Sequence, residues 1–529
     1  MKSIGIMVIA GAGLLAQTGP VSAERIREHV KFLSSDLLEG RGVGQRGGDL
    51  ATEYIATQFA LAGAQPAGEN GKYFQTVPLV GVETQPGAQL TASASGKTVS
   101  FSWLTDFVGA SDEQRPESRF EGEAIFVGHG ITAPEWNWDD FKGVDVRGKV
   151  LVLFTNEPNS SDPTFFEGRA LTYYGRWTYK YEEALRHGAA AAIIIHTTPT
   201  AGYGWDVVRS SWGHEDLQVQ LQSGEKALAL AGWLSRDAGE KLLGLSGNNV
   251  DELLAASDSR NFRPIPLGIR IRGDLQSKVR QINSRNVAAI VPGSDPQLKD
   301  EWVIFSAHWD HLGKGDPVDG DPIYNGAVDN ATGCGILLEL ARAWAALPHK
   351  PRRSALFLAV TAEEGGLRGS EFYANHPLIP AAKTALNLNY DAIYPWGRAK
   401  DVVLTGADRT SVWPTAQAVA RRLNLTITPD TEPEQGHYFR SDHFSFAHVG
   451  IPAFSIGHAT QFAGKPADFY GRSWQEFNAR HYHQPSDEFH ADWDFTALEQ
   501  AAEFGFILGS EIANQDALPG WKPGDAFHR

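Results

Sequence analysis

Hydrophobic residues in the second half of the chain gather in short runs, and longer segments with helical periodicity separate these runs. Apolar runs of this length predict buried strands, and they lie at residues 287–291, 302–305, 355–360, 385–389, 401–404 and 453–456. Between them, residues 332–346 and 411–423 repeat apolar side chains at the spacing of a helix. Strands that alternate with helices are typical of an α/β fold, with a mostly parallel mixed sheet sandwiched by helices.

The first half of the chain has a different pattern. Residues 24–64 have two segments of helical periodicity, and residues 74–110 alternate weakly, as strands do. The segment 42–47 fits G-x-G-x-x-G, but a helix-like segment precedes it where a dinucleotide site needs a strand, so we interpret it as a loop. Apolar runs near 123–127, 150–154 and 189–195 indicate a small β-rich unit. We therefore expect an N-terminal part of the α/β domain at 24–115, an inserted unit at 116–274, and the rest of the α/β domain at 275–529.

The N-terminus has the pattern of a secretory signal peptide. Lys2 is followed by an apolar run over residues 4–16 and a small-x-small exit that ends at Ala23. The run is shorter than the roughly 20 residues that span a bilayer, so a membrane anchor is the weaker interpretation. We expect cleavage after Ala23 and a secreted or periplasmic protein with no membrane association afterwards.

Composition narrows the possible partners and the sources of stability. The 529 residues carry a formal net charge of −16 without a long run of one sign. An acidic surface argues against nucleic acid as a partner. The single cysteine, Cys334, excludes an internal disulfide and lies among small and apolar residues, so we expect it to serve packing. The chain is long enough for core burial to stabilise it.

Acidic and imidazole side chains follow several of the predicted strands. In parallel α/β sheets, ligands gather at the carboxyl ends of strands. Any one such residue is a common loop residue, but the joint placement of so many ligand types predicts a site. Histidine and carboxylate ligands without thiolate suit a catalytic Zn²⁺ or Mn²⁺ site, and a bridging carboxylate can hold two ions. The residues concerned are His308, Asp310, Asp329, Glu363, Glu364, Asp391 and His483.

These segments together resemble the M28 family of zinc aminopeptidases. The resemblance covers residues from about 285 to 490 in the order of that family, and residues 37–42 and the unit at 120–270 also resemble its bacterial members and their protease-associated insert. The matching motifs are His308-Trp309-Asp310-His311, Gly326-Ala327-Val328-Asp329-Asn330, Glu363-Glu364, Asn389-Tyr390-Asp391, Arg440-Ser441-Asp442-His443 and Tyr482-His483-Gln484-Pro485-Ser486-Asp487.

The resemblance implies a role for each residue and a cofactor of two Zn²⁺ per chain. One zinc would be held by His308, Asp391 and a bridging Asp329, and the other by Asp329, Glu364 and His483. Glu363 would be the general base, and Asp310 would orient His308. Tyr438 would stabilise the oxyanion, although a packing role for its ring is an equal alternative. Arg440 would contact a substrate carboxylate or form a surface ion pair.

Three functions are compatible with this family. The resemblance favours a two-zinc aminopeptidase that acts on peptides, because the ligand set is complete. A carboxypeptidase, a dipeptidase or a glutaminyl cyclase on the same fold is the second alternative. A receptor-like binding protein without activity is the third, and the presence of every expected ligand disfavours it.

Overall fold

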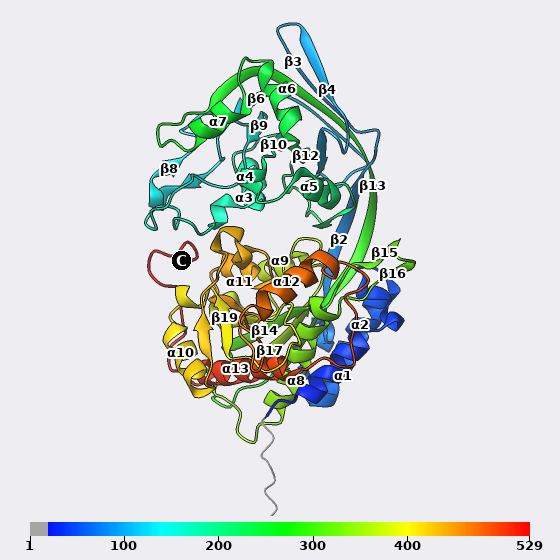
Figure 1. The fold of residues 1–529 in the computed structure, drawn as a ribbon, viewed down its shortest axis with the longest axis vertical. Coiled ribbons are helices and arrows are strands. Elements are labelled where there is room, and N and C mark those ends of the chain that lie inside the picture. Colours follow the sequence, from blue (N-terminus) through cyan, green and yellow to red (C-terminus); the bar gives the residue numbers. More distant parts are fainter. Residues whose placement is uncertain (1–19, 529) are drawn as a thin grey trace, which may run out of the picture.

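The computed structural model describes residues 20–528, which form two lobes stacked along the long axis of the molecule (Figure 1). The predicted signal peptide falls mainly on residues 1–19, outside the described residues. Within residues 20–528, no helix has the length and apolar character that crossing a membrane requires.

A mixed β-sheet forms the centre of the lower lobe. Its order is β11–β2–β13–β17–β14–β18–β21–β19–β20, and β17, β14, β18 and β21 run parallel to one another. The predicted strands of this lobe are confirmed with ends that differ by a few residues, except that the strand predicted at 287–291 is the end of β13, which begins at residue 265. The strands are β2 Phe74–Thr84, β11 Asp216–Val219, β13 Ile265–Val291, β14 Trp302–His308, β17 Ser354–Val360, β18 Thr384–Asn389, β19 Asp401–Thr405, β20 Thr426–Thr428 and β21 Ala453–Ile456.

Helices cover both faces of this sheet, which explains why its central strands are apolar throughout. Along β17, Phe357 packs in the core under α1, α2, α8 and α13, whereas Leu356 and Leu358 face the core under α9 and α11. The helices are α1 Ala23–Leu33, α2 Arg46–Ala62, α8 Thr332–Ala345, α9 Arg368–Asn375, α10 Trp413–Arg422, α11 His443–His448, α12 Phe469–Arg480 and α13 Thr496–Ala513.

The upper lobe has a second sheet, and the long strand β13 belongs to both sheets. The N-terminal part of β13 lies between β3 and β6, and its C-terminal part lies between β2 and β17 (Figure 1). The upper sheet continues through β9, β10 and β12 to β5. Its strands are β3 Gln89–Ala94, β4 Lys97–Phe101, β5 Phe107–Ala110, β6 Glu117–Phe126, β9 Val150–Leu153, β10 Ala191–Ile195 and β12 Leu230–Leu234.

The boundaries between the two lobes lie at other residues than those predicted from the sequence. We expected the insert to begin at residue 116, whereas β3, β4 and β5, which precede that residue, already pair within the upper sheet. The weak alternation of apolar and polar residues in these strands does not indicate which of the two sheets they join. The expected boundary at 274/275 falls inside β13, because this strand runs without a break from one sheet to the other. Five helices complete the described upper lobe: α3 Trp177–Arg186, α4 Thr198–Ala201, α5 Trp205–Trp212, α6 Arg236–Gly244 and α7 Val250–Ser257.

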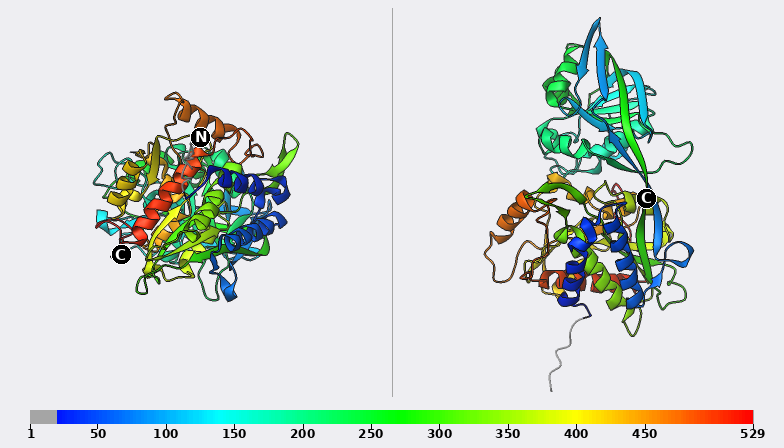
Figure 2. Two further views of the ribbon diagram at one scale, coloured as in Figure 1. Left: turned by 90° about the horizontal axis from the view of Figure 1, so that it is seen from below. Right: turned by 90° about the vertical axis from the view of Figure 1, so that its right-hand side faces the viewer.

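The two lobes touch on the side away from β13 as well. Arg169 of the upper lobe lies 2.7 Å from Glu434 of the lower lobe, and the Leu171 N–H donates to the Pro433 carbonyl. The last described residues, which end at 528, lie beside this junction (Figure 2). The upper lobe is therefore held against the lower lobe through the loop before α11 as well as through β13.

Candidate metal centre

The carboxyl ends of three adjacent parallel strands bring the predicted residues to one edge of the lower sheet. His308 is the last residue of β14, Glu363 and Glu364 follow β17, and Asp391 follows β18. Asp329 lies in the turn that precedes α8. Parallel pairing of β14 with β17 and β18 places these ends side by side, so residues far apart in the chain share one site.

His308 contacts three carboxylates of the cluster. Its Nε2 atom lies 3.2 Å from Asp391 Oδ1, 3.3 Å from Asp329 Oδ1 and 3.9 Å from Glu363 Oε2. The imidazole is buried and Asp391 is partly exposed, so the group opens towards solvent on the side of Asp391. Nitrogen and oxygen atoms in this arrangement can hold a divalent metal ion.

A second group lies next to the first and shares Asp329 with it. His483 Nε2 lies 3.1 Å from Glu364 Oε2 and 3.4 Å from Asp329 Oδ2. His311, for which the motifs predicted no role, brings its Nδ1 atom within 2.6 Å of Glu364 Oε1. Its Nε2 atom is buried without a hydrogen-bond partner among the described residues. The five predicted metal-binding side chains therefore lie together, and His311 is an additional imidazole beside them.

The charges of the cluster perturb one another. Burial alone would lower the pKa of His308, but the negative charges of Glu363 and Asp391 raise it well above its ordinary value. Burial raises the pKa of Glu363, although the nearby imidazole of His308 opposes this. Burial also acts on Glu364, but the charge of His483 lowers the pKa of that carboxyl to about 2. The negative charges of these buried carboxylates are balanced mainly by imidazoles. A bound cation would neutralise the charge that remains.

Two buried carboxylates fix the loops that present these residues. Asp310 Oδ1 and Oδ2 accept hydrogen bonds from the backbone N–H groups of Glu363 and Glu364, at 3.2 and 3.4 Å. The Asp310 carboxylate is 3.9 Å from His308 Nδ1, which instead lies 3.2 Å from the Asp310 backbone oxygen. Asp310 thus contacts the glutamate loop more closely than the imidazole that we expected it to orient. Asp487 accepts from the backbone N–H groups of Val328 and Asp329 in the same way.

Arg41 joins the opening helices to this site. Its guanidinium is buried and donates to the backbone oxygens of Trp309, Leu33, Asn325 and Gly326, at 2.6 to 2.8 Å. These bonds tie the loop after β14 to the turn that carries Asp329. Residues 37–42, known from the sequence only for their resemblance to bacterial members of the family, thus support the loops that present the cluster.

The backbone around the cluster adopts a conformation that is uncommon for residues with side chains. His483 has a φ angle of +57°, and Ala362 and Ala392, the neighbours of Glu363 and Asp391, have φ angles of +53° and +49°. Such left-handed residues cost free energy and gather at functional sites. The fold therefore stabilises three strained positions next to the predicted metal-binding side chains.

Tyr438 does not reach this cluster, so the oxyanion role that the resemblance implied for it is not supported. Its hydroxyl donates to the Ala453 carbonyl at 2.9 Å, and its ring packs against His443 and Phe527. The alternative packing role fits these contacts. Tyr482 lies at the cluster instead, because its ring stacks on His483 with centroids 3.9 Å apart. Burial, and then the charges of the four cluster acids, raise the pKa of Tyr482 well above its ordinary value.

A cavity of about 550 Å³ lies between the lobes and reaches the metal cluster. The upper lobe contributes Trp177, Tyr181 and Trp212 to its wall, and the lower lobe contributes Glu364 and Arg368. A polypeptide segment could approach the cluster through this space. The upper lobe thus forms part of the wall of the cavity beside the cluster.

The part of the chain that carries the metal cluster is similar in sequence to known peptidases. Residues 286–504 match the sequence model of Peptidase family M28. Aminopeptidase YwaD of Bacillus subtilis is 28% identical over 189 residues, which are 35% of this chain and 35% of that protein. Leupeptin-inactivating enzyme 1 of Streptomyces exfoliatus is 29% identical over 222 residues, 41% of this chain and 46% of that protein. The chain thus matches less than half the length of these relatives.

Among solved structures, an aminopeptidase from Aneurinibacillus sp. strain AM-1 aligns with 96% of this chain and 97% of its own length. The TM-score is 0.49 and the identity is 21%. A zinc aminopeptidase from Bacillus subtilis aligns with 93% of this chain and 95% of its own, at a TM-score of 0.43 and 16% identity.

Proposed function

We propose, from the premise that residues 286–504 belong to peptidase family M28, that the protein is a two-zinc aminopeptidase that removes N-terminal residues from peptides. One observation carries the proposal. The two carboxylate oxygens of Asp329 face different imidazoles, with Oδ1 3.3 Å from His308 Nε2 and Oδ2 3.4 Å from His483 Nε2. A carboxylate in this position can bridge two ions roughly 3.5–4 Å apart.

The chemistry of the donor atoms fits zinc. Each half of the cluster offers imidazole nitrogen and carboxylate oxygen and no thiolate, as catalytic zinc sites do. The Nε2 atom of His483 is buried and faces the carboxylates of Asp329 and Glu364, so the neutral imidazole would offer its lone pair to an ion held among them. His308, Asp391 and Asp329 would hold one ion, and Asp329, Glu364 and His483 the other. His311 would orient Glu364 through their 2.6 Å contact.

Bound zinc would supply Lewis acidity, polarising the scissile carbonyl and acidifying the attacking water. The rest of the reaction belongs to the protein. Glu363, whose backbone N–H is held by Asp310, accepts a proton from the water as the water oxygen attacks the carbonyl carbon. When the C–N bond breaks, Glu363 returns this proton to the departing amine nitrogen. Burial raises the pKa of Glu363, which suits a group that must both take and give a proton.

Tyr482 is our candidate for the group that stabilises the oxyanion, in place of Tyr438. Stacking on His483 fixes its ring beside the cluster, and nearly half of the side chain remains exposed. Its hydroxyl can then donate a hydrogen bond to the carbonyl oxygen as negative charge develops there. The raised pKa of Tyr482 keeps that proton on the hydroxyl at neutral pH.

The remaining parts of the proposal concern the upper lobe and the location of the protein. The relatives named as aminopeptidases support an exopeptidase that takes peptides as substrates. We infer that the upper lobe is a protease-associated domain, and its contribution of Trp177 and Trp212 to the cavity wall supports a role in substrate access. The N-terminal pattern up to Ala23 supports secretion or a periplasmic location.

Rates on three matched substrates test the activity. The zinc-loaded protein is expected to hydrolyse leucine p-nitroanilide and not its N-acetylated form, because an aminopeptidase needs a free N-terminal amine. A glutaminyl peptide should release an amino acid and not cyclise. Hydrolysis of the blocked substrate at the same rate, or cyclisation as the main reaction, would contradict the proposal. No reaction with any of them after zinc addition would favour a binding protein.

A further inference from the structure

The wall of the cavity between the lobes carries far more acidic than basic side chains. Among the residues from 20 to 528, seven acidic side chains line this cavity, against two basic ones, Lys226 and Arg368. Some of the acids are neutralised within the wall. Arg280 donates two hydrogen bonds of 2.6 Å to Glu215, and Arg368 lies 3.2 Å from Glu371. The cavity nevertheless keeps an excess of negative charge beside the metal cluster.

Two carboxylates of this wall lie together although their charges have the same sign. Asp112 follows β5 in the upper lobe, and Asp216 is the first residue of β11 in the lower sheet. The side-chain NH₂ group of Gln218 donates to Asp216 Oδ2 at 2.8 Å and lies 3.5 Å from Asp112 Oδ1. The cation nearest to Asp216 is Arg368, at 3.9 Å, and Asp112 forms no ion pair within the described part of the chain.

Repulsion between the two carboxylates is visible in the protonation of Asp112. Burial, and then the charge of Asp216, raise the pKa of Asp112 to about 7. A cation placed between two such groups would remove the repulsion and favour their ionised forms. The pair is therefore arranged as a site for a positive charge that the described residues do not provide.

The amide of Gln218 offers a further acceptor at the same place. This side chain lines the cavity and is only 6% exposed. Its NH₂ group also lies 3.3 Å from the Ser111 backbone oxygen, so three acceptors fix the orientation of the amide. Its Oε1 atom is buried and has no hydrogen-bond partner among residues 20–528. A buried oxygen without a donor costs free energy, and an ammonium or guanidinium group would supply the missing donor.

Aromatic rings form the side of the cavity that belongs to the upper lobe. Trp177, Tyr181 and Trp212 line it, and the ring of Trp212 lies 5.1 Å from that of Trp177 and 5.6 Å from that of Tyr181. The faces of aromatic rings attract cations, and a guanidinium also stacks on them. The rings can in addition pack against the alkyl part of a lysine or arginine side chain.

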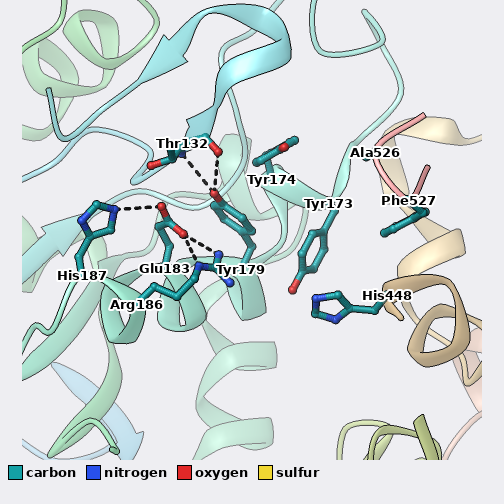
Figure 3. Close-up of a pocket in the computed structure, with 10 residues that line it drawn as sticks. All are labelled: Thr132, Tyr173, Tyr174, Tyr179, Glu183, Arg186, His187, His448, Ala526 and Phe527. Carbon is teal, nitrogen blue, oxygen red and sulfur yellow. Dashed lines mark hydrogen bonds and ion pairs between the residues drawn. The ribbon is translucent and has the colours of Figure 1, made fainter. Parts of the chain in front are cut away.

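A second cavity, on another face of α3, shows that the excess of negative charge is local (Figure 3). This cavity has a volume of about 490 Å³, and Glu183 is the only acid among its described lining residues. Arg186 and His187 lie 2.6 and 3.1 Å from the Glu183 carboxylate. Its acid is thus paired within the protein, whereas the cavity beside the metal cluster keeps acids without a counter-charge.

The strand β11 lies against the loop that carries the glutamates of the metal cluster. Arg368 Nε donates to the backbone oxygens of Leu217 at 2.6 Å and Gly365 at 3.1 Å, and a Cβ atom at Gly365 would lie 2.9 Å from Leu217 Cβ. Asp216 and Glu364 are the chain neighbours of these two residues. Since consecutive Cα atoms are about 3.8 Å apart, the Cα atoms of Asp216 and Glu364 are at most roughly 14 Å apart. A long side chain on the first or second residue of a substrate can span this distance.

We propose that Asp112, Asp216 and Gln218 bind the cationic side chain of a lysine or arginine in the first two residues of the peptide substrate. This inference rests on the proposed peptidase function and specifies its substrates. The cation lies between the two carboxylates and donates a hydrogen bond to the amide oxygen of Gln218. The free N-terminal amine is the other cation of such a peptide, and substrates that all retain it separate the two sources.

Two pairs of substrates test the preference in the zinc-loaded protein. The first pair is Arg-Leu amide and citrulline-Leu amide, and the second is Leu-Arg amide and Leu-citrulline amide. Citrulline keeps the shape of arginine and replaces the guanidinium by a neutral group. At pH 8, where Asp112 is largely ionised, the arginine member of at least one pair should have a kcat/KM roughly 10- to 100-fold higher. The pair that shows the preference identifies the position of the basic residue.

Variants connect this preference to the carboxylates. D112N and D216N are each expected to reduce the ratio of arginine to citrulline kcat/KM by roughly 10-fold or more, because each removes a charged acceptor. The control is D206N, which removes the same charge from an exposed position on α5, where Asp206 is paired with Arg209 outside the cavity wall. It should leave the ratio unchanged. Asp112 forms no ion pair, so D112N tests the inference even where D216N disturbs the fold around Arg368.

The outcomes separate this inference from the function on which it rests. If the wild-type protein cleaves the arginine and citrulline members of both pairs equally well, the basic side chain is not recognised and the peptidase activity stands. If the preference for arginine persists in both D112N and D216N, other residues bind the side chain and the inference fails. If none of the four substrates is cleaved and leucine p-nitroanilide is not cleaved either, the proposed function itself fails.

Discussion

Replacing Asp487 by asparagine tests how the fold positions the proposed bridging ligand. The Asp487 carboxylate accepts hydrogen bonds from the backbone N–H groups of Val328 at 2.9 Å and Asp329 at 3.1 Å, and its side chain is buried. Asparagine retains one acceptor oxygen and turns an NH₂ group towards the second N–H. The variant therefore loses one charge-assisted hydrogen bond and leaves a buried donor without an acceptor.

Each part of this change has a known magnitude. A hydrogen bond to a charged group contributes about 1.5–3 kcal/mol, so we expect D487N to lower the free energy of unfolding by about 2 kcal/mol in the metal-free protein. The turn with Asp329 would also be held less firmly. Loss of a residue that orients a metal ligand typically weakens metal binding by roughly 10- to 100-fold. Zinc affinity should therefore fall by about that factor, although Asp487 itself contacts no ion.

Two measurements separate these effects. Urea unfolding in the presence of a chelator gives the stability of the metal-free protein, and competition with a chromophoric chelator gives the zinc affinity. D494N is the control, because Asp494 is an exposed side chain that accepts from the Thr496 N–H, and asparagine replaces aspartate well in this capping role. If D487N binds zinc as tightly as the wild-type protein, the carboxylate does not position Asp329 and the reasoning is refuted.

Three further predictions concern catalysis and pH. E363Q should bind zinc normally by elemental analysis and lose roughly 10²- to 10⁴-fold in kcat, the usual contribution of a general base; wild-type turnover would exclude the role of Glu363. Y482F should lower kcat by about 10²-fold, whereas Y438F should cost only about 1 kcal/mol of stability through one lost hydrogen bond; the reverse pattern in kcat would restore Tyr438 as the oxyanion group. Burial, and then the charge of Asp216, raise the pKa of Asp112 to about 7. The folded protein thus binds this proton more tightly than the unfolded chain, and the contribution of Asp112 to stability falls as pH rises from about 4 to 7. D112N should therefore be more stabilising at pH 8 than at pH 5 in thermal unfolding, and an equal effect at both values would contradict the cause that we assign to the shift.

Local pattern was sufficient to predict much of the lower lobe. Strands buried on both faces appear as continuous apolar runs, so β14 and β17 were visible in the sequence with ends that differ by a few residues. Because ligand residues follow the carboxyl ends of parallel strands, His308 and Asp391 could be assigned to one edge of the sheet. Asp329 lies in the turn before α8 and not after a strand, and its place in the same site was implied by the family resemblance.

Long-range contacts account for what the sequence did not reveal. Nothing in the pattern near residue 41 indicates that Arg41 donates to carbonyls almost 270 to 285 positions away. The 27 residues of β13 alternate as any strand does, and only tertiary pairing shows that they serve two sheets. Tyr438 lies at the spacing that the resemblance implied, but the Ala453 carbonyl takes its hydroxyl. His311 is the last residue of the motif His308-Trp309-Asp310-His311, and only its contact with Glu364 in the folded protein shows that it lies at the cluster.

Zinc titration of the metal-free protein tests the central claim most directly. Binding followed by calorimetry should show two ions per chain, and D329N should weaken both, because Asp329 faces the imidazoles of both halves of the cluster. One ion per chain in the wild-type protein, or two ions bound with unchanged affinity by D329N, would contradict a centre bridged by this carboxylate.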